Sequence, residues 1–298
     1  MNTLPTPGSS IEQTPNSPEA IRAMVREKYA RIAEQSRDEN KASCCGAGGC
    51  STETYTIFAE DYSTQPGYVA DADLGLGCGI PTEFANIQPG QVVLDLGSGA
   101  GNDAFVARHL VGETGKVIGV DMTEAMIDKA RDNAEKLGYH NVEFRQGEIE
   151  KLPLAANRVD VIVSNCVLNL VPNKATAFAE MFRVLKPGGH FCVSDIVLGG
   201  LLPDGLKHVA ELYAGCVSGA IAAEDYLGLL QQAGFEQITV NKNREIQLPT
   251  DLLEAYLSPE QLAHYRSQGG VVRSITVSGY KPLSPTESAA SCSPGCCN

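Results

Sequence analysis

Short apolar runs alternate along the chain with longer segments whose apolar residues recur at helical spacing. The runs predict strands at residues 92–94, 116–120, 142–145, 159–164 and 190–195. The intervening segments predict helices at residues 102–110, 123–137 and 174–185. In the second of these helices, Met126, Ile127, Ala130 and Ala134 share one face, and Gly138 ends it. This alternation indicates an α/β fold, with a parallel sheet covered by helices on both faces.

The last third of the chain departs from this alternation. Its pattern predicts helices at residues 206–214 and 223–233 and a strand at residues 238–240. The sequence Ser258-Pro259-Glu260-Gln261 is a capping pattern that begins a further helix. The final strand, residues 271–280, follows soon afterwards without a crossover helix, so we expect it to pair antiparallel. The sheet then has seven strands.

The ends of the chain differ from its centre in composition. Residues 1–16 are rich in Pro, Ser and Thr, and Ser17 is placed to cap a helix that begins at Pro18. We therefore divide the chain into a flexible tail (residues 1–16), a helix with a cysteine-rich extension (17–90), an α/β core (91–200), a region of helices and terminal strands (201–282) and a cysteine-containing tail (283–298).

Charge and apolar content narrow the range of partners. The formal net charge of −13 would repel nucleic acid. No apolar run approaches the ~18 residues of a membrane span, and the first residues lack the features of a secretion signal. We expect a monomeric cytoplasmic protein that acts on a small molecule, with neither nucleic acid nor membrane as a partner.

The ten cysteines are the unusual feature of the composition. Six lie near the ends of the chain: Cys44, Cys45, Cys50, Cys292, Cys296 and Cys297. Four lie within the folded body: Cys78, Cys166, Cys192 and Cys216. In a cytosolic protein of this size, such a count favours thiol chemistry or soft-metal binding over structural disulfides. Cys192, inside the fifth predicted strand, is expected to be an ordinary core residue.

A glycine-rich turn follows the first predicted strand, where parallel α/β sheets bind their ligands. The turn reads Gly97-Ser98-Gly99-Ala100-Gly101, and Asn102 stands where a dinucleotide fingerprint requires glycine. Asp95, just before the turn, suits a cationic ligand. Asp121 ends the second strand and can accept both hydroxyls of a ribose. A nucleoside that carries an amino acid and no phosphate fits both acids, and S-adenosylmethionine is such a ligand; alternatively, the two acids simply end strands of an unrelated α/β protein.

The order of motifs from about Gln91 to Tyr280 resembles the class I S-adenosylmethionine methyltransferases. It includes the glycine turn, Gly147-Glu148-Ile149-Glu150 after the third strand and Leu185-Lys186-Pro187-Gly188-Gly189 before the fifth. The resemblance implies a doubly wound, Rossmann-like sheet of seven strands, the last antiparallel. The residues that it implies for cofactor binding are Asp95, Gly97, Ser98 and Gly99 at the methionine moiety, Asp121 at the ribose, Met122, Glu148 and Ile149 at the adenine, and Asn165 facing the methyl-transfer site.

The residue after Asn165 gives a clue to the methyl acceptor. An in-line transfer needs its nucleophile about 3–3.5 Å from the methyl carbon, so the acceptor lies beyond the fourth and fifth strands, where Cys166 is expected. No histidine flanks Asn165 to act as a general base. A thiolate binds soft centres, and trivalent arsenic is soft and keeps a nucleophilic lone pair. The pattern therefore favours an acceptor held by sulfur.

Three segments are similar to the arsenite methyltransferases: SNCVLNLVP at residues 164–172, GCVSGA at 215–220 and LGCGIP at 76–81. The resemblance implies that Cys166 and Cys216 bind trivalent arsenic, with Cys78 or Cys44 as the third ligand. It also implies that Cys44 and Cys78 relay electrons through disulfides, which thioredoxin or glutathione would restore. The N-terminal position is uncertain between Cys44, Cys45 and Cys50.

Two other functions share parts of this pattern. A carbon or oxygen methyltransferase acting on a quinone-like or lipid-like molecule would have the same core but an apolar acceptor pocket. A non-enzymatic thiol-rich carrier or sensor of soft metals would bind arsenic without consuming S-adenosylmethionine. Asp195, after the fifth strand, is taken as a solvated strand terminus. The Cys296-Cys297 tail either binds metal, delivers arsenic or is dispensable.

Overall fold

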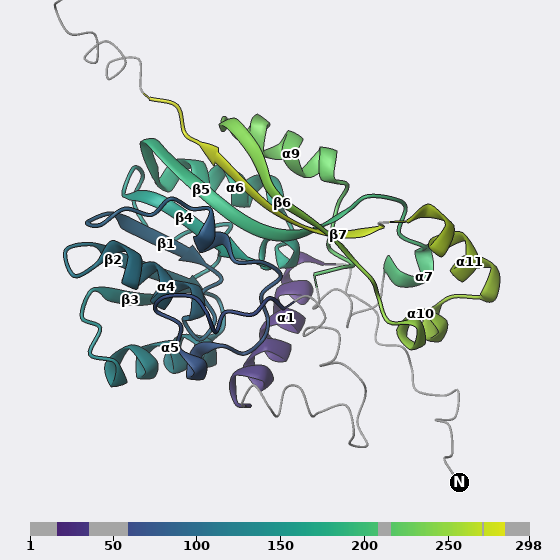
Figure 1. The fold of residues 1–298 in the computed structure, drawn as a ribbon, viewed down its shortest axis with the longest axis horizontal. Helices are drawn as coiled ribbons and strands as arrows, with labels where there is room; N and C mark the ends of the chain where they lie inside the picture. Colours follow the sequence, from purple (N-terminus) through teal and green to yellow (C-terminus); the bar gives the residue numbers. More distant parts are fainter. Residues whose placement is uncertain (1–16, 36–58, 208–215, 270, 284–298) are drawn as a thin grey trace, which may run out of the picture.

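The computed structural model describes residues 17–35, 59–207, 216–269 and 271–283. One seven-stranded sheet runs through this part of the chain (Figure 1). Its spatial order is β3 (Val142–Gln146), β2 (Lys116–Asp121), β1 (Val92–Leu96), β4 (Val159–Asn165), β5 (Leu185–Leu198), β7 (Val272–Tyr280) and β6 (Glu236–Ile246). β7 is antiparallel to both of its neighbours, which confirms the predicted topology.

Helices cover both faces of the sheet because each central strand is apolar on both sides. Val93 and Val161 pack with α4 (Asn102–Val111) and α5 (Glu124–Lys136) in one core. Leu94 and Ile162 point to the other face, where α6 (Lys174–Val184) and α9 (Ala223–Gln232) meet through Phe178 and Tyr226, whose ring centroids are 5.2 Å apart. Cys192 is fully buried in the first of these cores, as predicted.

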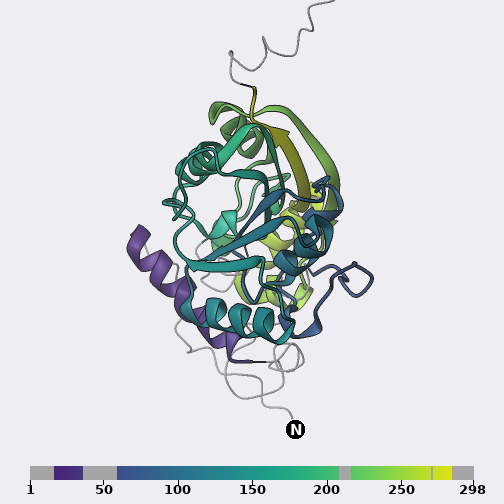
Figure 2. The same ribbon diagram turned by 90° about the vertical axis from the view of Figure 1, so that its left-hand side faces the viewer.

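The N-terminal helix α1 (Pro18–Ala33) lies alongside α5, outside the sheet (Figure 2). The Ser17 side chain accepts a hydrogen bond from the backbone N–H of Ala20 at 3.2 Å, so the predicted cap is present. The remaining helices are α7 (Asp204–Lys207), α10 (Thr250–Tyr256), α11 (Pro259–Gln268) and the 3-10 turns η2 (Ala70–Ala72), η3 (Pro81–Glu83) and η4 (Leu168–Leu170). No helix of the described residues is both long and apolar enough to cross a membrane.

Several boundaries differ from the prediction. β5 begins at Leu185 because Leu185 already pairs with Val159 of β4. The register then shifts across Pro187-Gly188-Gly189, where Gly188 has φ +76° and donates from its N–H to Lys281 O at 2.9 Å. β6 runs well beyond residues 238–240, because its polar second half is an exposed edge that carries no apolar signal.

The helical prediction was incomplete in the last third. The capping box that begins α11 at Ser258 is present. α10 was missed, since Pro249 precedes it without a side-chain cap. Of the helix predicted at residues 206–214, only its first two residues are described, within α7, and the others lie outside the described residues.

Candidate functional site

The glycine turn joins β1 to α4 and closes tightly over β2. The backbone N–H groups of Gly97 and Ser98 both donate to Val120 O, at 2.8 and 3.1 Å. Gly97 has φ +67°, and a Cβ there would lie 2.5 Å from a methyl group of Val167. The turn thus needs glycine both for its backbone conformation and for the close approach of the chain after β4.

Two acids frame this turn at the carboxyl ends of their strands. Asp121 accepts hydrogen bonds from Gly99 N–H at 3.0 Å and Thr123 N–H at 2.8 Å, so it fixes the turn. Asp95 is 2% exposed. Burial, with repulsion from Asp103 and Asp121, raises the pKa of Asp95 well above its usual range. The site therefore disfavours a bare carboxylate at Asp95 and favours one neutralised by a cation.

Unpartnered polar atoms show what the site is built to receive. Oδ2 of Asp95, Oγ of Ser98 and Oδ1 of Asn102 are buried and have no hydrogen-bond partner among the described residues. Buried polar atoms without partners are costly unless a ligand satisfies them. An acceptor-rich, negatively charged cradle fits the ammonium group of an amino acid and a sulfonium, as in S-adenosylmethionine.

A cleft opens at this edge of the sheet. The cofactor residues predicted from sequence all line it: Asp95, Gly97, Ser98, Gly99, Asp121, Met122, Glu148, Ile149 and Asn165. Cys166 lines it as well, next to Asn165. The structure thus gathers the predicted residues around one cavity, while their individual contacts to a cofactor stay predictions.

Helix α1 forms a wall of the cleft that the sequence did not predict. Arg22, Val25 and Tyr29 line the cavity. The Arg22 guanidinium lies 2.8 Å from a carboxylate oxygen of Glu150 and 3.6 Å from one of Glu148. These ion pairs join positions far apart in the chain, so periodicity could not reveal them. These ion pairs hold helix α1 next to Glu148, one of the residues expected to contact the adenine.

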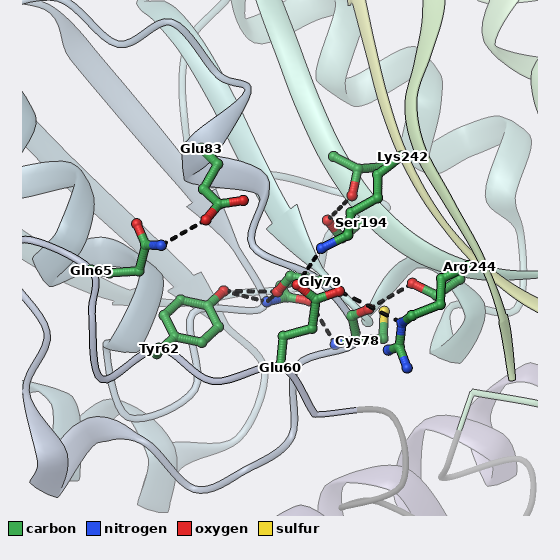
Figure 3. Close-up of polar contacts among 12 residues, drawn as sticks. Glu60, Tyr62, Gln65, Cys78, Gly79, Glu83, Ser194, Lys242 and Arg244 are labelled. Atoms are coloured by element: carbon green, nitrogen blue, oxygen red, sulfur yellow. Dashed lines mark hydrogen bonds and ion pairs between the residues drawn. The ribbon is translucent and has the colours of Figure 1, made fainter.

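The segment 59–83 crosses the opposite side of the site and is held by side chains of three strands, β4, β7 and β6 (Figure 3). Asn165, at the end of β4, donates from Nδ2 to Gly79 O at 2.8 Å and accepts from Cys78 N–H at 3.0 Å. Ser274 of β7 donates to Cys78 O at 2.6 Å. Lys242 of β6 reaches Glu60 at 2.6 Å. The peptide of Cys78 is thus held at both its N–H and its carbonyl.

Three cysteines converge beyond the cleft. Cys78, Cys166 and Cys216 are buried and not in disulfides. The Cys216 thiol donates to Cys166 O at 2.8 Å, and both residues have positive φ, +65° and +57°. Such backbone conformations are rare for residues with a Cβ and often mark functional sites. Hydrogen bonds with Cys216 and Cys78, together with burial, raise the pKa of the Cys166 thiol.

Comparison with known proteins accounts for this combination. Residues 87–234 match a methyltransferase domain family. An arsenite methyltransferase from Halobacterium salinarum is 42% identical, over 89% of this chain and 68% of its own. One from Aquipseudomonas alcaligenes is 33% identical, over 87% of this chain and 73% of its own. This chain belongs to the arsenite methyltransferase family.

A solved structure of an arsenite methyltransferase supports the assignment. The arsenic(III) S-adenosylmethionine methyltransferase of Chlamydomonas reinhardtii is 36% identical, with a TM-score of 0.57, over 70% of this chain and 68% of that one. The protein is therefore an enzyme that uses S-adenosylmethionine as its co-substrate, on a Rossmann-like methyltransferase sheet.

One buried acid of this chain, Asp195, differs from the prediction made from the sequence. Asp195 is 1% exposed and is not a solvated terminus, because β5 continues past it to Leu198. It accepts hydrogen bonds from Asn169 Nδ2 at 3.0 Å and Tyr226 Oη at 3.2 Å. Burial raises the pKa of Asp195 to about 7, opposed by the charge of Lys174. Its partners come from separate elements, so no local signal marks it.

The six cysteines near the ends of the sequence are not among the residues that the structure describes: Cys44 with the alternatives Cys45 and Cys50, and Cys292, Cys296 and Cys297. Asn165 lines the cleft as predicted, but its amide also holds the Cys78 segment, which the sequence did not indicate.

Proposed function

We propose that this protein methylates trivalent arsenic that Cys166 and Cys216 hold, as a step of arsenic detoxification. The observation that supports this most strongly is the meeting of three buried free thiols beside the cofactor cleft. Three thiolates around one soft centre match the pyramidal geometry of trivalent arsenic. Cys78, whose sulfur lies within 4.8 Å of that of Cys166, is the proposed third ligand in the resting site.

The thiols beside the cleft fit an acceptor that needs no deprotonation. No histidine lines the cleft in the described part of the chain. Arsenic bound by thiolates keeps a lone pair, whereas an oxygen or nitrogen acceptor would usually need a general base. The raised pKa of the Cys166 thiol means that it is protonated before arsenic binds, so its proton leaves with the thiol that delivered the arsenic.

The cofactor would be held by polar groups of the cleft, some of which the fold leaves without a partner. S-adenosylmethionine supplies an electrophilic methyl group. Asp95 and Ser98 would receive its amino-acid moiety, and Asp121 its ribose, beside Met122 and Glu148. Asn165 would orient the methyl-transfer side of the cleft while it holds Cys78 in place. All these groups belong to one chain, and we propose a monomer as the active unit.

Methylation raises arsenic to the pentavalent state, so two electrons must return before the next transfer. We propose that Cys44 and Cys78 supply them by closing a disulfide, with release of two protons. Thioredoxin or glutathione would then reduce the disulfide. This chemistry requires a reducing compartment such as the cytoplasm, where thiols persist.

A single assay tests the function. The purified protein is mixed with arsenite, a thiol and methyl-labelled S-adenosylmethionine, and the arsenic species are separated by chromatography. The proposal predicts labelled methylarsenic and equivalent S-adenosylhomocysteine. Arsenic binding without S-adenosylhomocysteine would identify a carrier, and turnover only with a quinone-like or lipid-like acceptor would identify a carbon or oxygen methyltransferase. Either outcome contradicts the proposal.

A further inference from the structure

Asp195 is the one acidic side chain grouped with two of the buried thiols in the described residues. One ligand atom each from Cys78, Cys166 and Asp195 lie within 4.8 Å of one another. Their exposed fractions are 0%, 6% and 1%. The carboxylate comes from β5, the Cys166 thiol from the residue after β4 and the Cys78 thiol from the segment 59–83, so three separate parts of the chain bring these donors together.

The hydrogen bonds of Asp195 leave room for a further partner. A carboxylate offers about four acceptor positions. Oδ1 accepts from Asn169 Nδ2 at 3.0 Å and from Ile196 N–H at 3.1 Å, and Oδ2 accepts from Tyr226 Oη at 3.2 Å. Among the described residues, these three donors leave a fourth position open on the carboxylate beside the thiols. Asn169 and Tyr226 thereby orient the carboxylate as neighbouring groups orient ligands in metal sites.

A third thiol, that of Cys216, lies beside this set, next to Cys166. Its thiol hydrogen-bonds to the Cys166 carbonyl at 2.8 Å and interacts with the Cys166 thiol. The peptide of Cys78 is fixed by Asn165 and Ser274, so the sulfurs sit on a constrained backbone. Two sulfurs and a carboxylate oxygen within 4.8 Å of one another, with the Cys216 thiol against Cys166, offer in a buried place the thiolate and carboxylate ligands that Zn²⁺ binds.

We propose that Cys78, Cys166 and Asp195 form a site for a thiophilic divalent cation of the Zn²⁺ and Cd²⁺ class, and that the neighbouring Cys216 thiol turns in as the fourth donor when the cation binds. Trivalent arsenic is satisfied by three sulfurs and a lone pair, so the oxygen of Asp195 is a donor that only the divalent cation requires. The ammonium group of Lys174 is placed to offset part of the excess negative charge, since it interacts electrostatically with Asp195 and Cys216. The cation and arsenic use the same sulfurs, so each excludes the other.

The proposed cation site shares its thiols with the proposed arsenic site, but binding of the cation does not depend on methyl transfer. The probe is therefore ¹¹³Cd²⁺ alone, added to the reduced full-length protein without S-adenosylmethionine. The ¹¹³Cd NMR spectrum distinguishes cadmium bound by three sulfurs and one oxygen from cadmium bound by sulfur only. We expect a signal of the first kind in the wild-type protein, and its loss when stoichiometric arsenite is added.

Asp195→Asn tests the oxygen donor while keeping the shape of the side chain. We expect this variant to lose about tenfold or more in cadmium affinity at that signal, with arsenite affinity unchanged. Cys192→Ser, which alters a buried cysteine of another core, should leave the signal as it is. A wild-type spectrum without a mixed sulfur–oxygen signal would overturn the proposal, whether or not the variant folds. An Asp195→Asn spectrum identical to wild type would overturn it as well.

Discussion

The side chain of Asn165 binds the backbone of Cys78, accepting a hydrogen bond from its N–H at 3.0 Å. The same side chain lines the cofactor cleft. One residue at the end of β4 therefore connects the place where the methyl donor binds to the peptide that carries a thiol. The position of the Cys78 sulfur depends on that contact and on Ser274, which binds the Cys78 carbonyl from the opposite side.

Ser274→Ala should impair arsenic methylation without weakening cofactor binding. The variant leaves the Cys78 carbonyl without its buried donor, a loss that costs about 1–3 kcal/mol. We expect kcat/KM for arsenite to fall about tenfold. Calorimetry should give an unchanged Kd for S-adenosylmethionine, and Ser274→Thr should restore activity.

Thr276→Val is the matched control for this prediction. Thr276 is buried on the same strand, and its hydroxyl pairs with Ser194 at 2.9 Å. An equal fall of kcat/KM in both variants would mean that any lost hydroxyl on β7 disturbs the sheet, and that Ser274 has no special role in positioning Cys78.

Gly97→Ala should damage the cofactor site beyond the cost of backbone strain. Gly97 and Gly112 have nearly the same positive φ, +67° and +68°. A Cβ at Gly97 would overlap Val167 at 2.5 Å, whereas a Cβ at Gly112 meets nothing within 4 Å. Gly112 has ψ −165°, a conformation that residues with a Cβ rarely adopt, so we expect Gly112→Ala to lose about 1–3 kcal/mol of stability with cofactor binding unchanged. Gly97→Ala should also weaken S-adenosylmethionine binding, by about tenfold or more. Equal cofactor affinity in the two variants would refute the steric explanation.

Arg22→Ala should loosen helix α1 from the cleft. The ion pair of Arg22 with Glu150 is half-buried and contributes about 1 kcal/mol, so we expect S-adenosylmethionine to bind about fivefold more weakly. Arg31→Ala removes an exposed pair with Glu27 on the same helix and should have no effect on the affinity. Isothermal titration of both variants tests this. Unchanged binding in Arg22→Ala would show that α1 is not part of the cofactor site.

Cofactor affinity should depend on pH through Asp95. Burial raises the pKa of Asp95, so the apo protein holds this proton more tightly than the unfolded chain does. The group's contribution to apo stability is thus present at low pH and is lost as pH rises through the raised pKa. A cationic ligand needs the ionised form. S-adenosylmethionine should therefore bind more weakly as pH falls through that pKa.

Asp95→Asn tests this dependence directly. The variant should bind S-adenosylmethionine weakly and with a flatter pH profile, when Kd is measured between pH 5.5 and pH 8.5. If the wild-type slope persists in the variant, another group controls the affinity. Asp103 is the first alternative, because burial raises its pKa to about 6.

The sheet and the cofactor turn could be predicted because their signals are local. Short apolar runs place β1 to β4 within a residue or two, and the glycine turn and Asp121 stand next to them in sequence. Only part of the edge strand β6 could be predicted, since its polar second half packs against one neighbour only and carries no apolar pattern.

The parts of the site that were missed depend on tertiary contacts. Asp195 resembled a strand end until the structure placed Asn169 and Tyr226 against it. The need for glycine at position 97 comes largely from Val167, which follows a different strand. Cys166 was predicted because it directly follows a strand end, whereas Cys78 and Cys216 required the family resemblance.

The central claim is that arsenic is methylated while Cys166 and Cys216 hold it. The most direct measurement is the single-turnover transfer of label from S-adenosylmethionine to arsenite in Cys166→Ser, Cys216→Ser and the core control Cys192→Ser, with cofactor affinity determined in parallel. We predict that the first two variants form no methylated arsenic while binding S-adenosylmethionine normally, and that Cys192→Ser stays active. Full methylation by Cys166→Ser or Cys216→Ser would contradict the account.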